Sequence, residues 1–481
     1  MDIGLLIGGA DTGAASGATF ERKDPVTGDV ATRAAAAKKD DVDKAVEAAA
    51  AAFPGWSETG PNRRRALLLK AADALEARTD DFIKTCIAET GGTGPWIGFN
   101  VMLAAGMLRE AASMTTQITG EVIPSDKPGT ISMALRQPVG VIVGMAPWNA
   151  PVILATRAIA MPLACGNTVV LKASEMCPAT HRMIGEILTD AGLPKGAVNV
   201  ITHAADDAPE VVSALIAHPK VKRINFTGST KVGRIVAEQA GRHLKPVLLE
   251  LGGKAPLIVL DDADIDAAVN AATFGAFMNQ GQICMSTERI VVDEKVADEF
   301  VEKLAAKAGS LPFGNPREHV VLGSMVDRSH AERVGDLIDD AVAQGAKLVT
   351  GGASDSTILP ASVLDHVNAN MRVYRDESFG PVVCVIRVNG VEGAIAVAND
   401  TEYGLAAAVF GRDVQRALSV ARRIESGICH VNGPTVADEA QMPFGGVKAS
   451  GYGRFGGKAA VDAFTELRWI TIEDAGQHYP F

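Results

Sequence analysis

A cysteine, a glutamate and an asparagine in this sequence each lie in a local setting that favours chemistry. Cys284 belongs to the run FMNQGQICMSTER, between a helix-like apolar stretch and a strand-like segment at 290–292. A thiol in such a short polar loop can be presented at the end of a helix. The five other cysteines follow no spacing pattern, so the context singles out Cys284 as the candidate for thiol chemistry.

Glu250 is a carboxylate inside an apolar run, LLELGG, which is followed by Lys254. Burial in such surroundings raises the pKa of a carboxyl group and can make it a general base near neutral pH. The alternative is a structural role, in which Glu250 pairs with a helix end or with Lys254.

Asn149 follows a predicted strand and precedes an apolar helix, in the segment APWNAP. Its position, with Pro151 two residues later, is typical of a helix N-cap. Alternatively, its amide points at a developing oxyanion, where such a donor contributes about 3–4 kcal/mol to transition-state binding. The sequence leaves both interpretations open.

The elements that must position these groups alternate between alanine-rich helices and short β-branched strands. The predicted strands are continuous apolar runs at 141–145, 168–172, 198–201, 221–226, 256–260, 290–292, 347–350 and 382–388. Continuous strands separated by helix-length spacers indicate parallel sheets covered by helices on both faces. The predicted fold class is therefore α/β.

Two strand ends are candidate ligand sites. Strand 221–226 leads through a polar turn at 227–233 into a helix at 234–243, which offers free N–H groups and a helix dipole to a phosphate. The turn reads GSTKVG, with Thr230 where the dinucleotide fingerprint has its second glycine, so a plain βα turn is an equal alternative.

The second candidate follows strand 168–172, where Lys172 and Glu175 lie in the crevice in which parallel sheets bind ligands. A carboxylate at that place suits a ribose diol. A solvated loop is the alternative for each residue taken singly.

Composition narrows the class of protein. With 481 residues, the chain is expected to form two large domains. Its formal net charge of −11 and lack of a long basic run argue against nucleic acid or an anionic membrane as partners. The six cysteines show no CxxC pair, so we expect a reduced, cytoplasmic protein with neither a disulfide framework nor a metal site. No signal-peptide pattern and no apolar run of the roughly 20 residues needed to cross a bilayer are found.

Two strand-like segments do not follow the alternation of helices and strands. Residues 120–136 predict an extended hairpin with a Lys-Pro-Gly turn, and 467–472 predict an isolated strand. Lone strands far apart in sequence often pair in an oligomerisation arm, so we expect a homo-oligomer, either a dimer or a tetramer.

Seven motifs in fixed order now become recognisable. They are PWN, GNTVVLKASE, FTGSTKVG, LELGGKAP, GQIC, ESFGPV and PFGGVKASGYGR. In this order and spacing, from about residue 25 to residue 472, the chain strongly resembles the NAD(P)-dependent aldehyde dehydrogenase superfamily. The phrases FMNQGQICMSTERIVVD and GICHVNGPTVADEAQMPFGG resemble most the bacterial salicylaldehyde, vanillin and benzaldehyde dehydrogenases.

The resemblance implies a role for each of the three reactive side chains. Cys284 would be the nucleophile, Glu250 the general base, and Asn149 an oxyanion donor together with the Cys284 backbone N–H. The thiolate would form a thiohemiacetal with an aldehyde, and hydride transfer would leave a thioester that water hydrolyses. Cysteine suits both steps because it is a good nucleophile and its thioester hydrolyses readily.

The resemblance also implies a dinucleotide site. Its residues would be Trp148, Lys172, Ser174, Glu175, Gly228, Ser229, Gly233, Glu377 and Phe379. Lys172 and Glu175 would hold the adenosine ribose and Glu377 the nicotinamide ribose. Because Glu175 suits a free diol, NAD is the expected cofactor and NADP the less favoured alternative.

A substrate pocket is predicted beside the nucleophile. Its expected residues are Trp96, Phe99, Leu103, Ala150, Ile153, Arg157, Ile283 and Val436. Arg157 lies two helical steps of four after Asn149 and shares its side. It either binds a ring substituent of the substrate or forms a buried pair with Asp438 or Glu439, and the two readings carry equal weight. We expect a flat aromatic aldehyde.

Two positions depart from the family pattern, because Phe455 stands where many members carry a Glu and Ala158 where many carry a Lys. Other readings are an aliphatic or semialdehyde dehydrogenase, an inactive homologue, and a member that transfers the acyl group to coenzyme A.

The resemblance implies an architecture in three parts: a Rossmann-like cofactor-binding domain, an α/β catalytic domain and a small β oligomerisation arm. The expected boundaries are 1–117 with 139–251 for the NAD-binding domain, 252–450 for the catalytic domain, and 118–138 with 451–481 for the arm and C-terminal tail.

Overall fold

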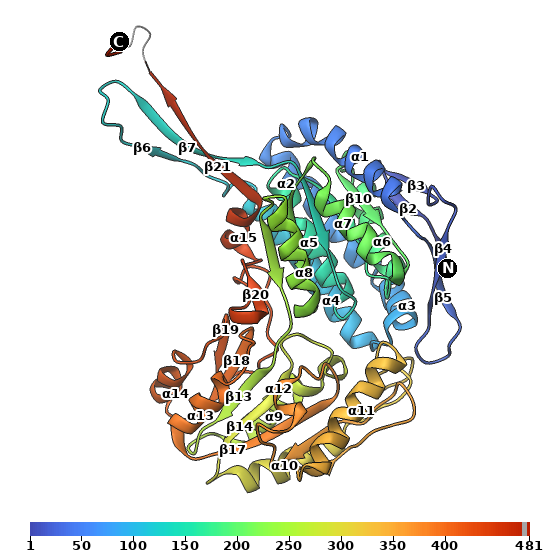
Figure 1. Cartoon of the computed structure of the whole chain (residues 1–481), viewed down its shortest axis with the longest axis vertical. Coiled ribbons are helices and arrows are strands. Elements are labelled where there is room, and N and C mark those ends of the chain that lie inside the picture. Colours follow the sequence, from blue (N-terminus) through green and yellow to red (C-terminus); the bar gives the residue numbers. More distant parts are fainter. Residues whose placement is uncertain (474–478) are drawn as a thin grey trace.

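The computed structural model describes residues 1–473 and 479–481. Residues 474–478, which belong to the predicted C-terminal tail, lie outside the described residues. In the described part, two large sheets are each flanked by helices, and a long β arm projects away from them, with the C-terminus near its tip (Figure 1).

The first large sheet has eight strands with a parallel centre. In spatial order they are β20 (Gly451–Tyr452), β12 (Val247–Glu250), β11 (Val221–Thr227), β8 (Val141–Met145), β9 (Thr168–Lys172), β10 (Val198–Ile201), β2 (Leu5–Ile7) and β3 (Ala10–Thr12). The strands from β12 to β10 pair in parallel, whereas β20, β2 and β3 join as antiparallel edges.

The helices associated with this sheet come from both ends of the chain. They are α1 (Lys39–Ser57), α2 (Pro61–Ala77), α3 (Thr79–Thr90), α4 (Gly94–Met114), α5 (Pro151–Ala164), α6 (Pro178–Asp190), η1 (Ala205–Asp207), α7 (Ala208–Ala217), α8 (Thr230–Arg242) and α15 (Gly457–Phe464). Helix α5 is buried along its whole length because α4, α6 and β9 all pack against it. This apolar helix therefore offers a rigid support for the residues at its N-terminus.

The second large sheet has seven strands. In spatial order they are β15 (Lys347–Thr350), β16 (Ser362–Asp365), β17 (Val382–Val388), β14 (Thr287–Asp293), β13 (Ala255–Val259), β18 (Ala406–Phe410) and β19 (Ile428–Val431). All neighbours pair in parallel except β15 with β16. The accompanying helices are α9 (Ile265–Phe277), η2 (Met278–Gly281), α10 (Ala297–Gly309), α11 (Arg328–Ala343), α12 (Arg372–Arg375), α13 (Gly390–Asn399), α14 (Val414–Ala421) and η3 (Lys448–Ser450).

Two smaller sheets complete the described structure. One contains β1 (Asp2–Ile3), β5 (Val30–Ala35) and β4 (Thr19–Lys23). The arm contains β6 (Glu121–Ile123), β7 (Ile131–Pro138) and β21 (Thr465–Ile472), and β21 pairs antiparallel with β7 over the full length of both strands (Figure 1). The predicted hairpin and the predicted isolated strand thus lie side by side.

The predicted α/β class is confirmed, with parallel centres and antiparallel edge strands in both large sheets. The boundaries proposed for the three domains stay a prediction. Within the described residues, no helix has the length and apolarity that crossing a membrane would require.

Candidate active site

Cys284 lies between η2 and β14, at the end of a strained stretch of backbone. Asn279 and Gln280, just before it, adopt positive φ angles of 49° and 54°, which non-glycine residues rarely do. Gly253 packs so closely against the Cys284 carbonyl oxygen that a Cβ at residue 253 would collide with it. The segments that carry Cys284 and Glu250 are therefore fixed relative to each other.

The Cys284 thiol is partly buried and has a pKa well above its ordinary value. Burial is the main cause, and the nearby Glu250 carboxylate adds to it because two negative charges would repel each other. The thiol is therefore protonated at neutral pH and needs a base to become a nucleophile.

Glu250, the last residue of β12, is that neighbouring base candidate. It is 1% exposed, and burial raises its pKa to about 7, although Arg157 and the Cys284 thiol partly offset the effect. Its Oε1 atom has no hydrogen-bond partner among the described residues. The alternative of a pair with Lys254 is wrong, because Lys254 forms its ion pair with Glu288.

Asn149 presents its amide to the same region. Its Nδ2 donates to the Gln282 carbonyl at 3.0 Å, which leaves the second N–H of the amide for another acceptor. Its own carbonyl accepts from Trp96 Nε1 at 3.2 Å and from Asn279 Nδ2 at 2.9 Å. The N-cap prediction is wrong, because Ala150 occupies the cap position and the Asn149 amide is bonded to a segment more than 130 residues away.

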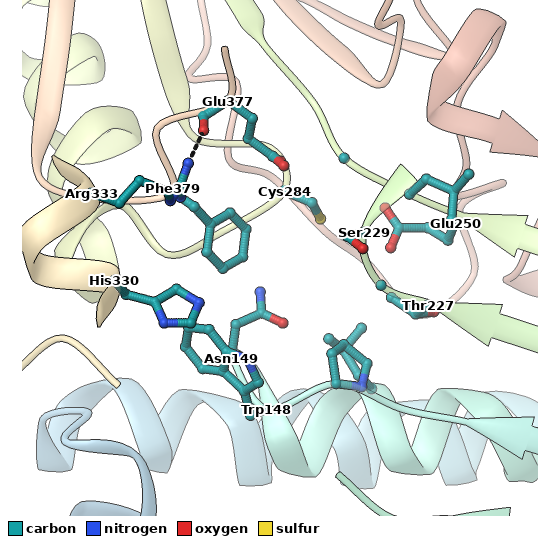
Figure 2. Close-up of a pocket in the computed structure, with 15 residues that line it drawn as sticks. Trp148, Asn149, Thr227, Ser229, Glu250, Cys284, His330, Arg333, Glu377 and Phe379 are labelled. Atoms are coloured by element: carbon teal, nitrogen blue, oxygen red, sulfur yellow. Dashed lines mark hydrogen bonds between the residues drawn. The ribbon is translucent and has the colours of Figure 1, made fainter. Parts of the chain in front are cut away.

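A cavity of about 300 Å³ is lined by all three of these residues (Figure 2). Five predicted cofactor residues also line it: Trp148, Gly228, Ser229, Glu377 and Phe379. The other four, Lys172, Ser174, Glu175 and Gly233, do not line this cavity.

Gly228 and Ser229 form the whole turn between β11 and α8. The helix begins at Thr230, four residues earlier than predicted, because the Ser229 hydroxyl accepts from Val232 N–H and caps it. Gly233 consequently lies inside α8, where a Cβ would collide with Leu251. This glycine allows close packing of helix on strand, and Ser229, which caps the helix, lines the cavity.

Lys172 and Glu175 lie at the carboxyl end of β9, next to β8, which leads to Trp148. Burial lowers the pKa of Lys172. Burial opposes ionisation of Glu175, but the Lys172 ammonium keeps the pKa of that carboxyl below its ordinary value. Ser174 accepts from Met176 N–H and donates its own N–H to His181 Nδ1, so the loop has a defined shape.

Glu377 and Phe379 enter the cavity from the loop before β17. Burial, strengthened by Glu288, raises the pKa of Glu377 to about 8, and its Oε1 accepts from Gly253 N–H at 2.9 Å. The Phe379 ring meets the Trp148 ring edge-on, with centroids 5.7 Å apart (Figure 2).

Several residues that line this cavity were not predicted, among them His330 and Arg333. His330 lies edge-on to Trp148 with ring centroids 5.6 Å apart, and Arg333 donates to the carbonyls of Glu377 and Ser378 at 2.7 and 2.6 Å (Figure 2). Both come from α11, where the sequence carries an ordinary amphipathic pattern that gives no local signal of a site.

A second cavity, of about 250 Å³, also ends at Cys284. Its walls include seven predicted substrate residues: Trp96, Phe99, Ala150, Ile153, Arg157, Ile283 and Val436. Leu103 is not among them and packs against the core instead. Phe274 and Phe444 line the cavity and were not predicted. The cavity is mainly apolar and rich in aromatic rings.

Arg157 forms an ion pair with Asp438, and its guanidinium lies 4.1 Å from the centroid of the Phe444 ring. Both charged side chains are nine-tenths buried. The ion pair with Asp438, one of the two alternatives predicted for Arg157, is therefore present. Contact of Arg157 with a substrate stays a prediction. Phe455, at the position where many family members carry a Glu, also lies near this guanidinium, with its ring centroid 6.0 Å from Arg157 Cζ.

The residues present fit a dinucleotide. A glycine-serine turn at a capped helix, a carboxylate in the loop after β9 and a buried glutamate near two aromatic rings are groups that suit a pyrophosphate, a ribose and a nicotinamide. Among residues 1–473 and 479–481, no cluster of three or more His, Cys, Asp or Glu side chains is arranged for a metal ion.

The two cavities meet at the Cys284 thiol and the Asn149 amide, and the buried carboxylate of Glu250 lines the first of them. The chain belongs to the aldehyde dehydrogenase family, whose model matches residues 12–470. It is accordingly an oxidoreductase of a family that uses NAD(P).

Among its relatives, a vanillin dehydrogenase of Pseudomonas fluorescens is 63% identical over 481 residues, which is 100% of both chains. A salicylaldehyde dehydrogenase of Pseudomonas putida is 52% identical over 483 residues, again 100% of both. The crystal structure of a salicylaldehyde dehydrogenase from Pseudomonas putida G7 complexed with salicylaldehyde superposes with a TM-score of 0.98 at 52% identity and covers 100% of both chains. The family and the fold predicted from the motifs are confirmed.

Proposed function

We propose that this protein oxidises aromatic aldehydes to carboxylic acids with NAD, through a thioester on Cys284. The observation that carries the proposal is the second cavity, in which aromatic and apolar side chains lead directly to the thiol. Flat rings bind well in such a setting because aromatic pairs stack or meet edge-on. Full-length identity of 63% to a protein named vanillin dehydrogenase and of 52% to one named salicylaldehyde dehydrogenase supports it.

In the first step, Glu250 takes the Cys284 proton. Because burial raises both pKa values, the thiol keeps its proton near neutral pH while the Glu250 carboxyl group is partly ionised, and the ionised form accepts the thiol proton as the sulfur approaches a carbonyl carbon. The oxyanion that forms on the substrate then accepts from the free N–H of the Asn149 amide and from the Cys284 backbone N–H.

The nicotinamide, when bound, supplies the acceptor for the hydride that leaves the substrate carbon. Glu377 would hold the ribose of that half, and Trp148 and Phe379 would exclude water beside the ring. Lys172 and Glu175 would hold the adenosine ribose. The negative charge of Glu175 would repel a phosphate on that ribose, so we propose NAD rather than NADP.

Glu250 releases the proton taken from Cys284 to solvent, and in the last step it accepts a proton from water while the water oxygen attacks the thioester carbon. The carboxylic acid leaves and Cys284 recovers its proton. Hydrolysis rather than transfer to coenzyme A is proposed because this buried base is positioned beside the thiol.

Asn149→Ala is expected to lower kcat for aldehyde oxidation by about 10²- to 10³-fold, the usual effect of removing one oxyanion donor. Affinity for NADH should change little, since the amide contributes at the reacting carbon. Steady-state kinetics and NADH titration measure the two quantities. A kcat within threefold of wild type would remove Asn149 from the mechanism.

The substrate class is tested with a panel of aldehydes. We expect kcat/KM for vanillin, salicylaldehyde and benzaldehyde to exceed that for acetaldehyde and hexanal by about tenfold or more, because one aromatic ring in an apolar pocket contributes at least 1–3 kcal/mol. NADH formation at 340 nm gives the rates, and repeating the assay with NADP tests the cofactor. Equal or better use of the aliphatic pair would overturn the aromatic assignment.

We also propose a cytoplasmic homo-oligomer with the three-part domain division given above. All six cysteines are free thiols, as a reducing compartment favours. The arm exposes large apolar side chains, among them Val122, Leu467 and Trp469, the last of which is 75% exposed. Such a surface is covered in an assembly rather than left to water.

A further inference from the structure

A buried ion pair that is not part of the proposed catalytic residues joins the two segments that carry Glu250 and Cys284. Lys254 follows Glu250 by four residues, and Glu288 follows Cys284 by four residues. Lys254 immediately precedes β13 and Glu288 lies on the neighbouring strand β14; the two side chains are 0% and 3% exposed and form a salt bridge. Burying two charges costs desolvation free energy, and a buried ion pair offsets that cost when both side chains also form further hydrogen bonds.

Those further bonds all go to one loop. Glu288 accepts from the backbone N–H of Ser378 at 2.8 Å and from that of Phe379 at 3.1 Å. Lys254 donates to the Asp376 carbonyl at 2.7 Å. The ion pair therefore holds both ends of the segment 376–379.

The same segment presents two proposed cofactor contacts. Glu377 lies between the bonded residues, and its carboxylate is aimed at Gly253 N–H. Phe379 has a φ of +49°, a conformation that a phenylalanine adopts only when its surroundings enforce it. The bond from Phe379 N–H to Glu288 is one such restraint. Arg333 supplies the other by holding the carbonyls on the opposite side of the loop.

We propose that Glu288 is a positioning residue for the cofactor, which fixes segment 376–379 so that Glu377 and Phe379 are preorganised for the nicotinamide half. The proposal rests on the function proposed above for those two residues. A carboxylate is needed because it accepts two N–H groups and an ammonium at once, whereas a glutamine would turn its NH₂ group toward one of these donors.

The test measures cofactor binding and thiol chemistry separately in the full-length protein. Glu288→Gln is expected to weaken NADH binding, followed by quenching of tryptophan fluorescence, by about 10- to 100-fold, the usual effect of removing a group that orients a ligating side chain. Hydrolysis of an activated aryl ester needs no cofactor and relies on Cys284, Glu250 and Asn149, none of which Glu288 touches. It should stay within about twofold of wild type, well below the tenfold that 1.4 kcal/mol would produce.

Asp365→Asn is the matched control. Asp365 is a buried carboxylate of the same sheet, 3% exposed, and is paired with Arg387 rather than with the cofactor loop. It should lower the melting temperature without weakening NADH binding. If Glu288→Gln fails to fold, the double variant Lys254→Met/Glu288→Gln removes the unpaired charge and should show the same loss of NADH affinity.

NADH affinity within twofold of wild type in the folded variant would overturn the proposal. An equal loss of NADH affinity in Asp365→Asn, or a parallel loss of ester hydrolysis in Glu288→Gln, would overturn it as well, since general destabilisation would then explain the result. Failure of the proposed function is distinguishable, because the wild-type protein itself would then neither bind NADH nor oxidise aldehydes.

Discussion

Cys284→Ala should abolish aldehyde oxidation, with kcat lowered by about 10⁴-fold or more, as loss of a nucleophile does in covalent enzymes. In the proposed mechanism Asn149 only donates a hydrogen bond and Glu250 only transfers protons, so neither replaces the sulfur as the nucleophile. The fold should persist, since the thiol borders two cavities and leaves few packing contacts to lose. NADH production from vanillin measures the activity, and NADH titration verifies that the site is intact.

Cys429→Ala is the control for this experiment. Cys429 is likewise partly buried but lies on β19 and lines neither of the two cavities at Cys284. It should keep full activity. More than 1% residual activity in Cys284→Ala, or a comparable loss in Cys429→Ala, would contradict the assignment of the nucleophile.

Glu250→Gln should give the second largest effect, a fall in steady-state kcat of about 10²- to 10⁴-fold, which is the usual contribution of a general base. Glutamine cannot accept a proton, so both activation of the Cys284 thiol and hydrolysis of the thioester should slow. Rapid mixing of enzyme, NAD and vanillin measures the first turnover of NADH separately from the steady-state rate, and both should fall. Glu238→Gln, an exposed glutamate on α8, is the control and should behave as wild type.

The pH profile gives an independent test of the same residue. Burial raises the pKa of Glu250 to about 7, so the carboxyl group is protonated and inactive as a base below that pH. The wild-type rate should therefore rise as the pH increases through 7, and this limb should vanish in Glu250→Gln. An unchanged limb in the variant would mean that another group controls the rate.

Local signals in the sequence predicted the parallel centres of the two large sheets. Strands 141–145, 168–172 and 382–388 were predicted with the bounds that the structure has, because continuous β-branched runs between helices leave few other conformations. The first strands of the chain were missed. They are short and only partly apolar, and they become strands because they pair with distant edges such as β10.

The site shows the same division. The order of the motifs predicted Cys284 and Glu250 as site residues. For Asn149 the local sequence favoured a helix N-cap, because it could not show that the amide donates to the distant Gln282 carbonyl, two residues before Cys284. The sequence could not decide between the two roles considered for Arg157 either, because its partner Asp438 lies 281 residues away. In both cases the deciding observation is a contact between residues far apart in the sequence, which residue type alone does not predict.

The two cavities have different walls but share Asn149, Leu154 and Cys284. A single synthetic molecule can therefore extend from one into the other past the sulfur, with a flat ring at one end and a nucleotide-like group at the other. Linking the halves makes the second binding event intramolecular, so such a compound would gain affinity far beyond either half alone. A weakly electrophilic linker placed at the shared point would turn it into a mechanism-directed covalent probe of this enzyme.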